Sequence, residues 1–164
     1  MIDLAAERPE SPELLFVGGT GRSGTHVVSQ LLANHSRWAR VPIEARFHVN
    51  PQGFPDLLAG RVSPDEFLRK LRRFWWRRIR AGEVAPVIAR RLAFGRKVRG
   101  LHKVVERDRF DAAVAEFERA AGTDLDLACR NLYLDLLWPI AAVAGKPWLI
   151  EMSCFTIAES PTLV

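Results

Sequence analysis

The sequence has no apolar run long enough to span a bilayer and too few cysteines for a disulfide framework. The best candidate for a span, residues 132–144, is shorter than the roughly 18 uncharged residues that a span needs, and it includes Asp135 and Pro139. Two cysteines and four scattered histidines give no zinc-ligand spacing. The acidic residues 1–13 lack the basic-then-apolar order of a signal peptide. These absences favour a soluble, cytoplasmic protein without a bound metal.

Internal repeats and low-complexity segments are also absent, and lysine is scarce. Of the 24 basic residues, 20 are arginine and 4 are lysine. The net charge of +5 is unevenly divided, because residues 69–109 contain 15 Lys or Arg against 3 acids, whereas the rest of the chain has 9 basic and 16 acidic residues. Arginine suits bidentate contacts with phosphate or sulfate, but a genome rich in G and C would give the same bias.

The length and composition fit a single globular domain. The chain has 164 residues, of which 48% are hydrophobic and 26% charged. The apolar run at residues 14–17 predicts a buried parallel strand, and that at residues 148–152 predicts another buried strand. Residues 38–43 are a candidate second strand, which Pro42 weakens. We therefore expect a polar leader over residues 1–13, followed by one α/β domain with a short parallel sheet over residues 14–164.

The patterning between the second and third predicted strands is mostly helical, so we expect residues 54–145 to form a mainly helical insertion. A helix is predicted over residues 63–80, because its first four residues, S-P-D-E, have the form of a capping box with proline at the first helical position. Two further helices are predicted over residues 108–121 and 124–144, the second kinked or broken near Pro139.

A glycine-rich loop follows the first predicted strand and leads into a helix that contains Val27 and Leu31. Residues 18–25 have the sequence G-G-T-G-R-S-G-T. Such a loop at a helix start is an anion site, because free backbone N–H groups point at the ligand and the helix dipole favours negative charge. The alternative is a tight strand-to-helix turn with nothing bound.

Two general nucleotide-binding patterns can be compared with this loop. The triphosphatase pattern G-x-x-x-x-G-K-[ST] fits from Gly19 to Gly24, but a threonine stands where the pattern needs lysine. The dinucleotide pattern G-x-G-x-x-G fits Gly19, Gly21 and Gly24, and Glu44 lies about where a ribose-binding acid is expected. A long helical stretch before the next strand and Pro42 within the second strand fit that fold poorly. A Rossmann-type NAD(P)-binding protein stays an alternative.

Residues 14–50 resemble the start of sulfotransferases that use the donor 3′-phosphoadenylyl sulfate. That family opens with a strand, a loop of the form (P or G)-R-S-G-T, a helix ending in L-x-x-H, and a second strand leading to an acid. The matching residues here are Gly21-Arg22-Ser23-Gly24-Thr25, Leu32-Ala33-Asn34-His35 and Glu44. Residues 145–155 loosely resemble a later family segment, G-K-x-x-W-x-x-K-[ST]-P.

Three positions depart from the family pattern. His26 stands where the family repeats Thr or Ser, and Met152 and Cys154 replace the Lys and Pro of the later segment. A donor contact from that lysine is therefore not implied for this chain. The family's contacts to the donor's 3′-phosphate follow the third strand, past the last residue of this sequence. We therefore expect the N-terminal portion of such a domain, and the activity of this chain alone stays open.

The resemblance implies a P-loop-type nucleotide-binding fold. It also implies transfer of a sulfuryl group to a hydroxyl or amine of an acceptor, which is an unknown small molecule, glycan or lipid. Neither a metal nor a nucleic acid is expected to take part. The resemblance implies that the donor site is formed by Gly21, Arg22, Ser23, Gly24 and Thr25. Arg22 is also expected to neutralise charge during the reaction.

The resemblance assigns the general base to Glu44. The alternative for this residue is a carboxylate at a strand end that is paired with Arg46. Arg46 and His48 are candidate contacts for the acceptor or the sulfate, or else solvated side chains.

The predicted helix 63–80 is strongly basic, with seven Lys or Arg around Phe74, Trp75 and Trp76. Such a helix could make a peripheral contact with an anionic membrane surface or line a cleft for an anionic acceptor. It could also make the chain a non-catalytic remnant that binds an anionic partner. The favoured interpretation is a solvated face whose aromatic side chains pack on the sheet.

Overall fold

The computed structural model describes residues 12–20, 23–79 and 98–153, and these residues form a mixed arrangement of helices and strands. In chain order the elements are β1 (Glu13–Phe16), α1 (Thr25–Leu32), β2 (Trp38–Arg40), α2 (Phe54–Leu58), α3 (Pro64–Lys70), the π-helix η1 (Leu71–Trp75), β3 (Arg78–Ile79), β4 (Val98–Arg99), the 3₁₀-helix η2 (Leu101–Lys103), α5 (Arg107–Ala120), α6 (Leu125–Val143) and β5 (Trp148–Glu151). Within these described residues, the helices are all too short or too polar to cross a membrane.

Three parallel strands form an open sheet in which β5 lies between β1 and β2. The N–H groups of Val17 and Val41, one residue past the two outer strands, donate to the carbonyl oxygens of Glu151 and Ile150, each over 2.8 Å. The three predicted strands are confirmed, although the second ends before Pro42, which has no N–H for a ladder. All three strands end at one edge of the sheet, which we call the carboxyl edge.

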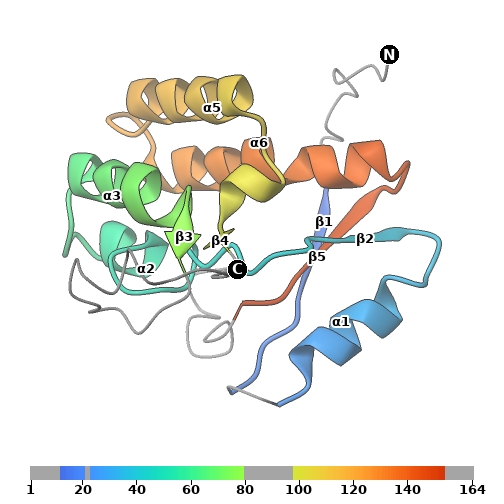
Figure 1. Ribbon diagram of the computed structural model, residues 1–164. Coiled ribbons are helices and arrows are strands. Elements are labelled where there is room, and N and C mark those ends of the chain that lie inside the picture. Colours follow the sequence, from blue (N-terminus) through green and yellow to red (C-terminus); the bar gives the residue numbers. More distant parts are fainter. Residues whose placement is uncertain (1–11, 21–22, 80–97, 154–164) are drawn as a thin grey trace.

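Helices cover the sheet from both sides (Figure 1). α6 packs against β2 and β5 and also against α5, whereas α1 lies on the other side of the sheet. Because α6 is enclosed between two layers, nearly half of its side chains are buried, as expected of a helix that is apolar on most of its surface. The helix predicted over residues 124–144 is confirmed as α6, and it is not broken at Pro139.

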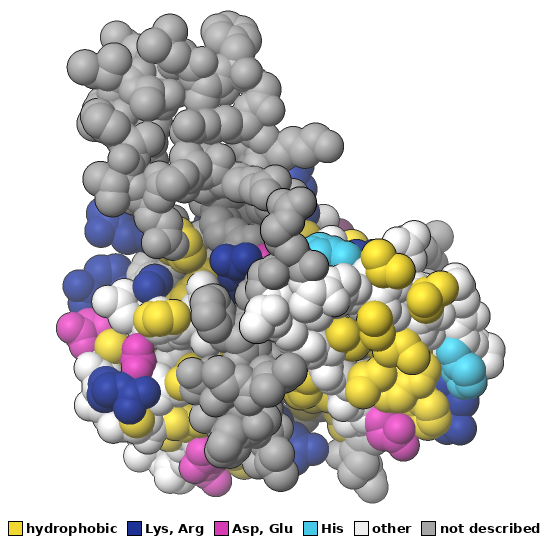
Figure 2. All heavy atoms as spheres, turned by 90° about the horizontal axis from the view of Figure 1, so that it is seen from below, with side chains coloured by type: hydrophobic (Ala, Val, Ile, Leu, Met, Phe, Trp, Pro, Cys, Tyr) yellow, Lys and Arg dark blue, Asp and Glu magenta, His cyan; other side chains and the backbone are white. Residues whose placement is uncertain are grey.

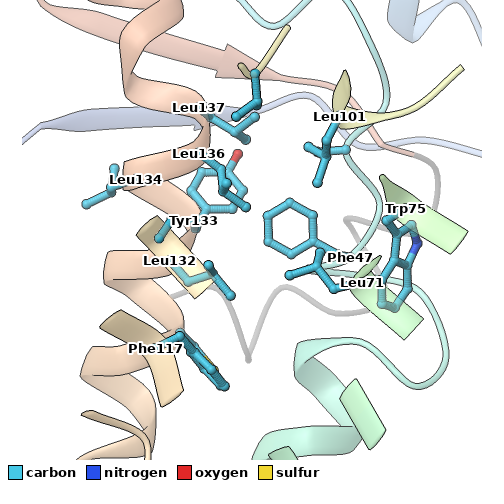
Figure 3. Packing of buried hydrophobic residues seen from close by; sticks show 14 of the residues in the cluster. Phe47, Leu71, Trp75, Leu101, Phe117, Leu132, Tyr133, Leu134, Leu136 and Leu137 are labelled. Atoms are coloured by element: carbon cyan, nitrogen blue, oxygen red, sulfur yellow. The ribbon is translucent and has the colours of Figure 1, made fainter. Parts of the chain in front are cut away.

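The hydrophobic core joins α6 to the helices between β2 and β5. Figure 3 shows Phe47, from the segment after β2, between Tyr133 of α6 and Trp75 of η1. The ring centroids of Tyr133 and Trp75 are 5.9 Å and 6.5 Å from that of Phe47, which is fully buried. Aromatic side chains bury large areas and pack in defined orientations. The segment after β2 is therefore fixed in the core rather than lying free on the surface.

The helix predicted over residues 63–80 is shorter than expected. Its capping box is confirmed, since Ser63 N–H donates to Glu66 Oε2 over 2.8 Å and Glu66 N–H donates to Ser63 Oγ over 3.3 Å. After Lys70, however, the chain becomes π-helical and then enters β3. The wider π turn keeps both Leu71 and Trp75 buried. The helix predicted over residues 108–121 is confirmed as α5.

The basic side chains of this region face solvent. Arg69, Arg72 and Arg73 are exposed, while Trp75 is buried. Nη2 of Arg72 lies 2.7 Å from Glu118 Oε1 of α5. Residues 69–77 therefore form the solvated basic face favoured from the sequence, but Trp75 packs on Phe47 and Phe67, which lie outside the strands of the sheet. Much of the remaining basic segment falls within residues 80–97, outside the described residues.

Helix α1 directs its apolar side chains outward. Val27, Val28 and Leu31 are 62%, 46% and 64% exposed, and the buried residue of this helix is Ser29. Figure 2 shows hydrophobic side chains gathered on the face of the molecule that includes α1. The helix predicted at these residues is confirmed, but its apolar positions do not contribute to the core of the described residues.

Lys146, just after α6, joins the end of α1 to the start of β2. Its Nζ donates to the carbonyl oxygens of Ala33, His35 and Trp38 over 2.9, 3.2 and 2.9 Å. We predict that Lys146→Met lowers the free energy of unfolding by about 1–3 kcal/mol, because charge-assisted hydrogen bonds are lost. Urea unfolding measures this, with the exposed Lys103→Met as control, expected within about 0.5 kcal/mol of wild type. Equal effects of the two substitutions would contradict the prediction.

Candidate functional site

The carboxyl edge of the sheet brings together three segments that are far apart in the sequence. The glycine-rich loop leaves β1, the turn containing Glu44 leaves β2, and residues 152–153 leave β5. In open parallel sheets, ligands bind outside the carboxyl ends of the strands. A ligand site is therefore expected at this edge.

The loop between β1 and α1 returns on itself before the helix begins. Ser23 N–H donates to Thr20 O over 3.2 Å. A Cβ on Gly19 would overlap the Ser23 hydroxyl and the Thr25 methyl group, so a larger residue there would force these side chains to move. Gly24 has φ of +84°, a left-handed conformation that glycine adopts without strain. Gly21 and Arg22, two of the predicted donor contacts, lie outside the described residues.

The first turn of α1 has the properties of an anion site. Gly24 occupies the N-cap position and has no side chain with which to cap the helix. The N–H groups of Thr25 and His26 precede the first intrahelical hydrogen bonds, which run from Val27 and Val28 to Gly24 O. The first turn contains no acidic residue. Uncapped amides at the positive end of a helix dipole favour phosphate or sulfate.

Glu44 lies beside this helix turn and is paired with two basic side chains. Its Oε2 accepts from Arg46 Nε over 2.7 Å and also contacts Nη2 of the same guanidinium. Its Oε1 lies 3.5 Å from His26 Nε2. The ion pair with Arg46 that the sequence offered as an alternative is present. The same carboxylate also faces α1, so the two interpretations of Glu44 are not mutually exclusive.

A buried carboxylate at the end of β5 holds the turn that contains Glu44. Glu151, only 1% exposed, accepts from Ala45 N–H over 3.1 Å, from Ser153 N–H over 2.9 Å and from Ser153 Oγ over 2.6 Å. Ser153 Oγ in turn accepts from Arg46 N–H over 3.0 Å. Arg46 has φ of +64°, which is strained for a residue with a side chain. These hydrogen bonds stabilise that conformation.

His48 is not a surface residue. It is fully buried, and its Nε2 lies 3.1 Å from Glu151 Oε2. The prediction that it contacts an acceptor or is solvated is therefore wrong, because Phe16, Phe47 and Tyr133 enclose its ring. Burial and the Glu151 charge raise the pKa of the Tyr133 phenol well above its usual value, so this side chain stays neutral.

Met152 occupies the position where the resembling family has lysine, and a different cation lies near it. Its Sδ accepts from Ser29 Oγ over 3.0 Å. Arg40, the last residue of β2, donates from Nε to the same Ser29 Oγ over 3.1 Å, and its Nη2 is 4.0 Å from the Met152 sulfur. Cys154 lies outside the described residues.

The sequence interpretation missed Glu151, Ser153 and His26. Glu151 had a detectable signal, because an acid inside the apolar run W-L-I-E-M must be paired if that run is a buried strand. His26 was noted as a departure from a family pattern, but its partner could not be identified. The contact with Glu44 depends on the turn after β2, which no local pattern predicts.

The buried Glu151 predicts a specific pH dependence of stability. Burial alone would raise the pKa of Glu151, but His48, the Ser153 hydroxyl and the Ala45 N–H together lower it below its usual value. A lowered pKa in the folded state stabilises the fold above the unfolded value of about 4.3, and this stabilisation is lost as pH falls through the folded-state value.

We predict that Glu151→Gln lowers the free energy of unfolding at pH 7 by about 1–3 kcal/mol, since the side-chain NH₂ of Gln would face an N–H or O–H donor that the carboxylate accepts from. Urea unfolding between pH 3 and 7 should also show a shallower acid-side decline for this variant than for wild type. The exposed Glu13→Gln is the control and should keep the wild-type profile. If the wild-type and Glu151→Gln profiles were parallel, Glu151 would not be the group responsible.

Comparison of the chain with protein-family models, curated proteins and solved structures found no match. Among the residues that the structure describes, no three His, Cys, Asp or Glu side chains are grouped as a metal site requires. The function of the carboxyl edge must therefore be argued from the chain's own side chains and backbone.

Proposed function

We propose that this chain binds 3′-phosphoadenylyl sulfate at the loop between β1 and α1, in a P-loop-type α/β fold, and transfers its sulfuryl group to the hydroxyl or amine of an acceptor. The proposal begins from the resemblance of residues 14–50 to the family that uses this donor. It is supported by the uncapped start of α1, whose amides can bind an anion. A cytoplasmic location is part of the same proposal.

Sulfuryl transfer needs an anion clamp and a proton acceptor in the same place. The clamp must hold the bridging phosphosulfate and offset the charge that develops on the leaving phosphate. By resemblance, this falls to the amides of residues 21–25 and to the side chains of Arg22, Ser23 and Thr25. The proton acceptor must reach the acceptor hydroxyl beside that clamp.

One observation supports the proposal above all others. Glu44 Oε1, after β2, lies 3.5 Å from His26 Nε2 in the first turn of α1. A carboxylate from the second strand is thus adjacent to the helix start that would bind the donor. A loop that served only as a strand-to-helix turn would not require such a neighbour.

The strand order weakens the Rossmann-type alternative. In the dinucleotide-binding and flavodoxin-like folds, the first and second strands of the sheet are neighbours, and the ribose-binding acid follows the second strand. In this sheet β5 separates β1 from β2. Glu44 therefore follows a strand, β2, that is not adjacent to the strand that leads into the glycine-rich loop, β1.

A non-catalytic chain that binds an anionic partner is the second alternative. It is motivated by the exposed Arg69, Arg73 and Arg77. Arg72 of the same segment is engaged by Glu118, which reduces the charge presented to a partner. Peripheral contact with a membrane would use the same surface.

Titration with adenosine 3′,5′-bisphosphate, the product of the donor, tests the proposal. We predict calorimetric binding that Arg22→Ala weakens by about 10- to 100-fold, because a charge-assisted hydrogen bond contributes about 1.5–3 kcal/mol. Arg61→Ala is the control, since Arg61 is exposed and paired with Asp56 away from the carboxyl edge.

Three outcomes separate the alternatives. Binding of NAD(P) without the bisphosphate would favour the Rossmann-type protein. Binding of acidic vesicles or polyanions, with neither nucleotide bound, would favour the non-catalytic chain. Bisphosphate binding that Arg22→Ala and Arg61→Ala affect equally would contradict the role of the loop.

A further inference from the structure

The imidazole of His26 is accessible at the carboxyl edge, whereas the carboxylate beside it is not. The His26 side chain is 56% exposed, and that of Glu44 is 10% exposed. A group that takes a proton from a bound substrate must be within hydrogen-bond reach of that substrate. Of this pair, the exposed imidazole meets the requirement more readily.

Both oxygens of Glu44 are already directed at basic groups. Oε2 accepts from Arg46 Nε over 2.7 Å, and Oε1 faces His26 Nε2. A substrate hydroxyl would have to displace one of these neighbours to reach the carboxylate. His26 has a second ring nitrogen, Nδ1, which is directed away from the atom that faces Glu44.

The carboxylate is held in this position from the core of the protein. The guanidinium of Arg46 is its partner, and the backbone N–H of Arg46 donates a hydrogen bond to Ser153 Oγ. Ser153 Oγ in turn donates to the buried Glu151. Ala45 N–H also donates to Glu151. An exposed base backed by a fixed carboxylate is the arrangement by which enzymes orient and polarise an imidazole.

We propose that His26 is the proton acceptor of the sulfuryl transfer, and that Glu44 is a positioning residue that orients its ring. This inference rests on the proposed function and reassigns the base that the resemblance gave to Glu44. With Nε2–H directed at Glu44, the lone pair of Nδ1 is available to the acceptor.

In this transfer the proton, the sulfuryl group and the leaving electron pair each have an acceptor. The acceptor O–H proton passes to His26 Nδ1 while the acceptor oxygen forms a bond to sulfur. The bond between sulfur and the bridging phosphate oxygen breaks, and its electron pair leaves on adenosine 3′,5′-bisphosphate. The imidazolium then returns its proton to water.

A double-mutant cycle with chemical rescue tests this assignment. Turnover is measured as bisphosphate release from 3′-phosphoadenylyl sulfate, with 4-nitrophenol as the hydroxyl probe. We expect His26→Ala to lower kcat between about 10²- and 10⁴-fold, the usual contribution of a general base, and added imidazole to restore part of it. Glu44→Gln should lower kcat in wild type but have little further effect in His26→Ala, because residues that act as a unit are not additive.

His35, an exposed histidine just after the end of α1, provides the matched control. His35→Ala should keep wild-type turnover and show no response to imidazole. Retained activity in His26→Ala would overturn the inference and return the base role to Glu44. An equal effect of Glu44→Gln in both backgrounds would overturn the positioning role.

A second measurement does not depend on turnover of the probe. Diethyl pyrocarbonate acylates accessible imidazoles, and peptide mass spectrometry locates the label. Saturating bisphosphate should protect His26 from labelling by at least several-fold while His35 stays reactive. If bisphosphate bound without protecting His26, the inference about His26 would be wrong, but the proposed function would not be contradicted. If the chain did not bind bisphosphate, the proposed function itself would be contradicted.

Discussion

The buried carboxylate of Glu151 is the constraint on which the carboxyl edge depends. A charge in this position is costly unless it is fully paired, and its partners come from the turn after β2 and from the residues after β5. Satisfying Glu151 therefore fixes where the chain runs after β2. Glu44, which precedes Ala45 in that turn, is consequently held beside α1, so its carboxylate acquires a defined position through a core interaction.

The position of β5 explains why the site is assembled from distant parts of the sequence. Because β5 lies between β1 and β2, its carboxyl end is next to both the glycine-rich loop after β1 and the turn that contains Glu44 after β2. Glu151, the last residue of β5, and Ser153, just after it, accept hydrogen bonds from backbone N–H groups of the turn. The helices between β2 and β5 supply the core against which Phe47 is fixed (Figure 3). The helical insertion thus supports the site without contributing a described side chain to it.

Local patterns predicted the elements and the loop, whereas long-range contacts decided the roles of the side chains. The apolar runs, the capping box at Ser63 and the glycine-rich loop depend on neighbouring residues, and the structure contains each of them. The π-helical turn after Lys70 and the burial of His48 depend on tertiary packing that no sequence window contains. The sequence also indicated an acid near the loop at Glu44, but the partners that determine its chemistry come from α1 and from the turn.

We propose that the loop after β1 and the Glu44 turn form one anion-binding site with His26 at its edge, which a crystal structure of the chain with adenosine 3′,5′-bisphosphate would test. The 5′-phosphate is expected within hydrogen-bond distance of the Thr25 and His26 amides, with the His26 ring still against Glu44. A nucleotide bound elsewhere, or a loop left empty at saturating ligand, would contradict it.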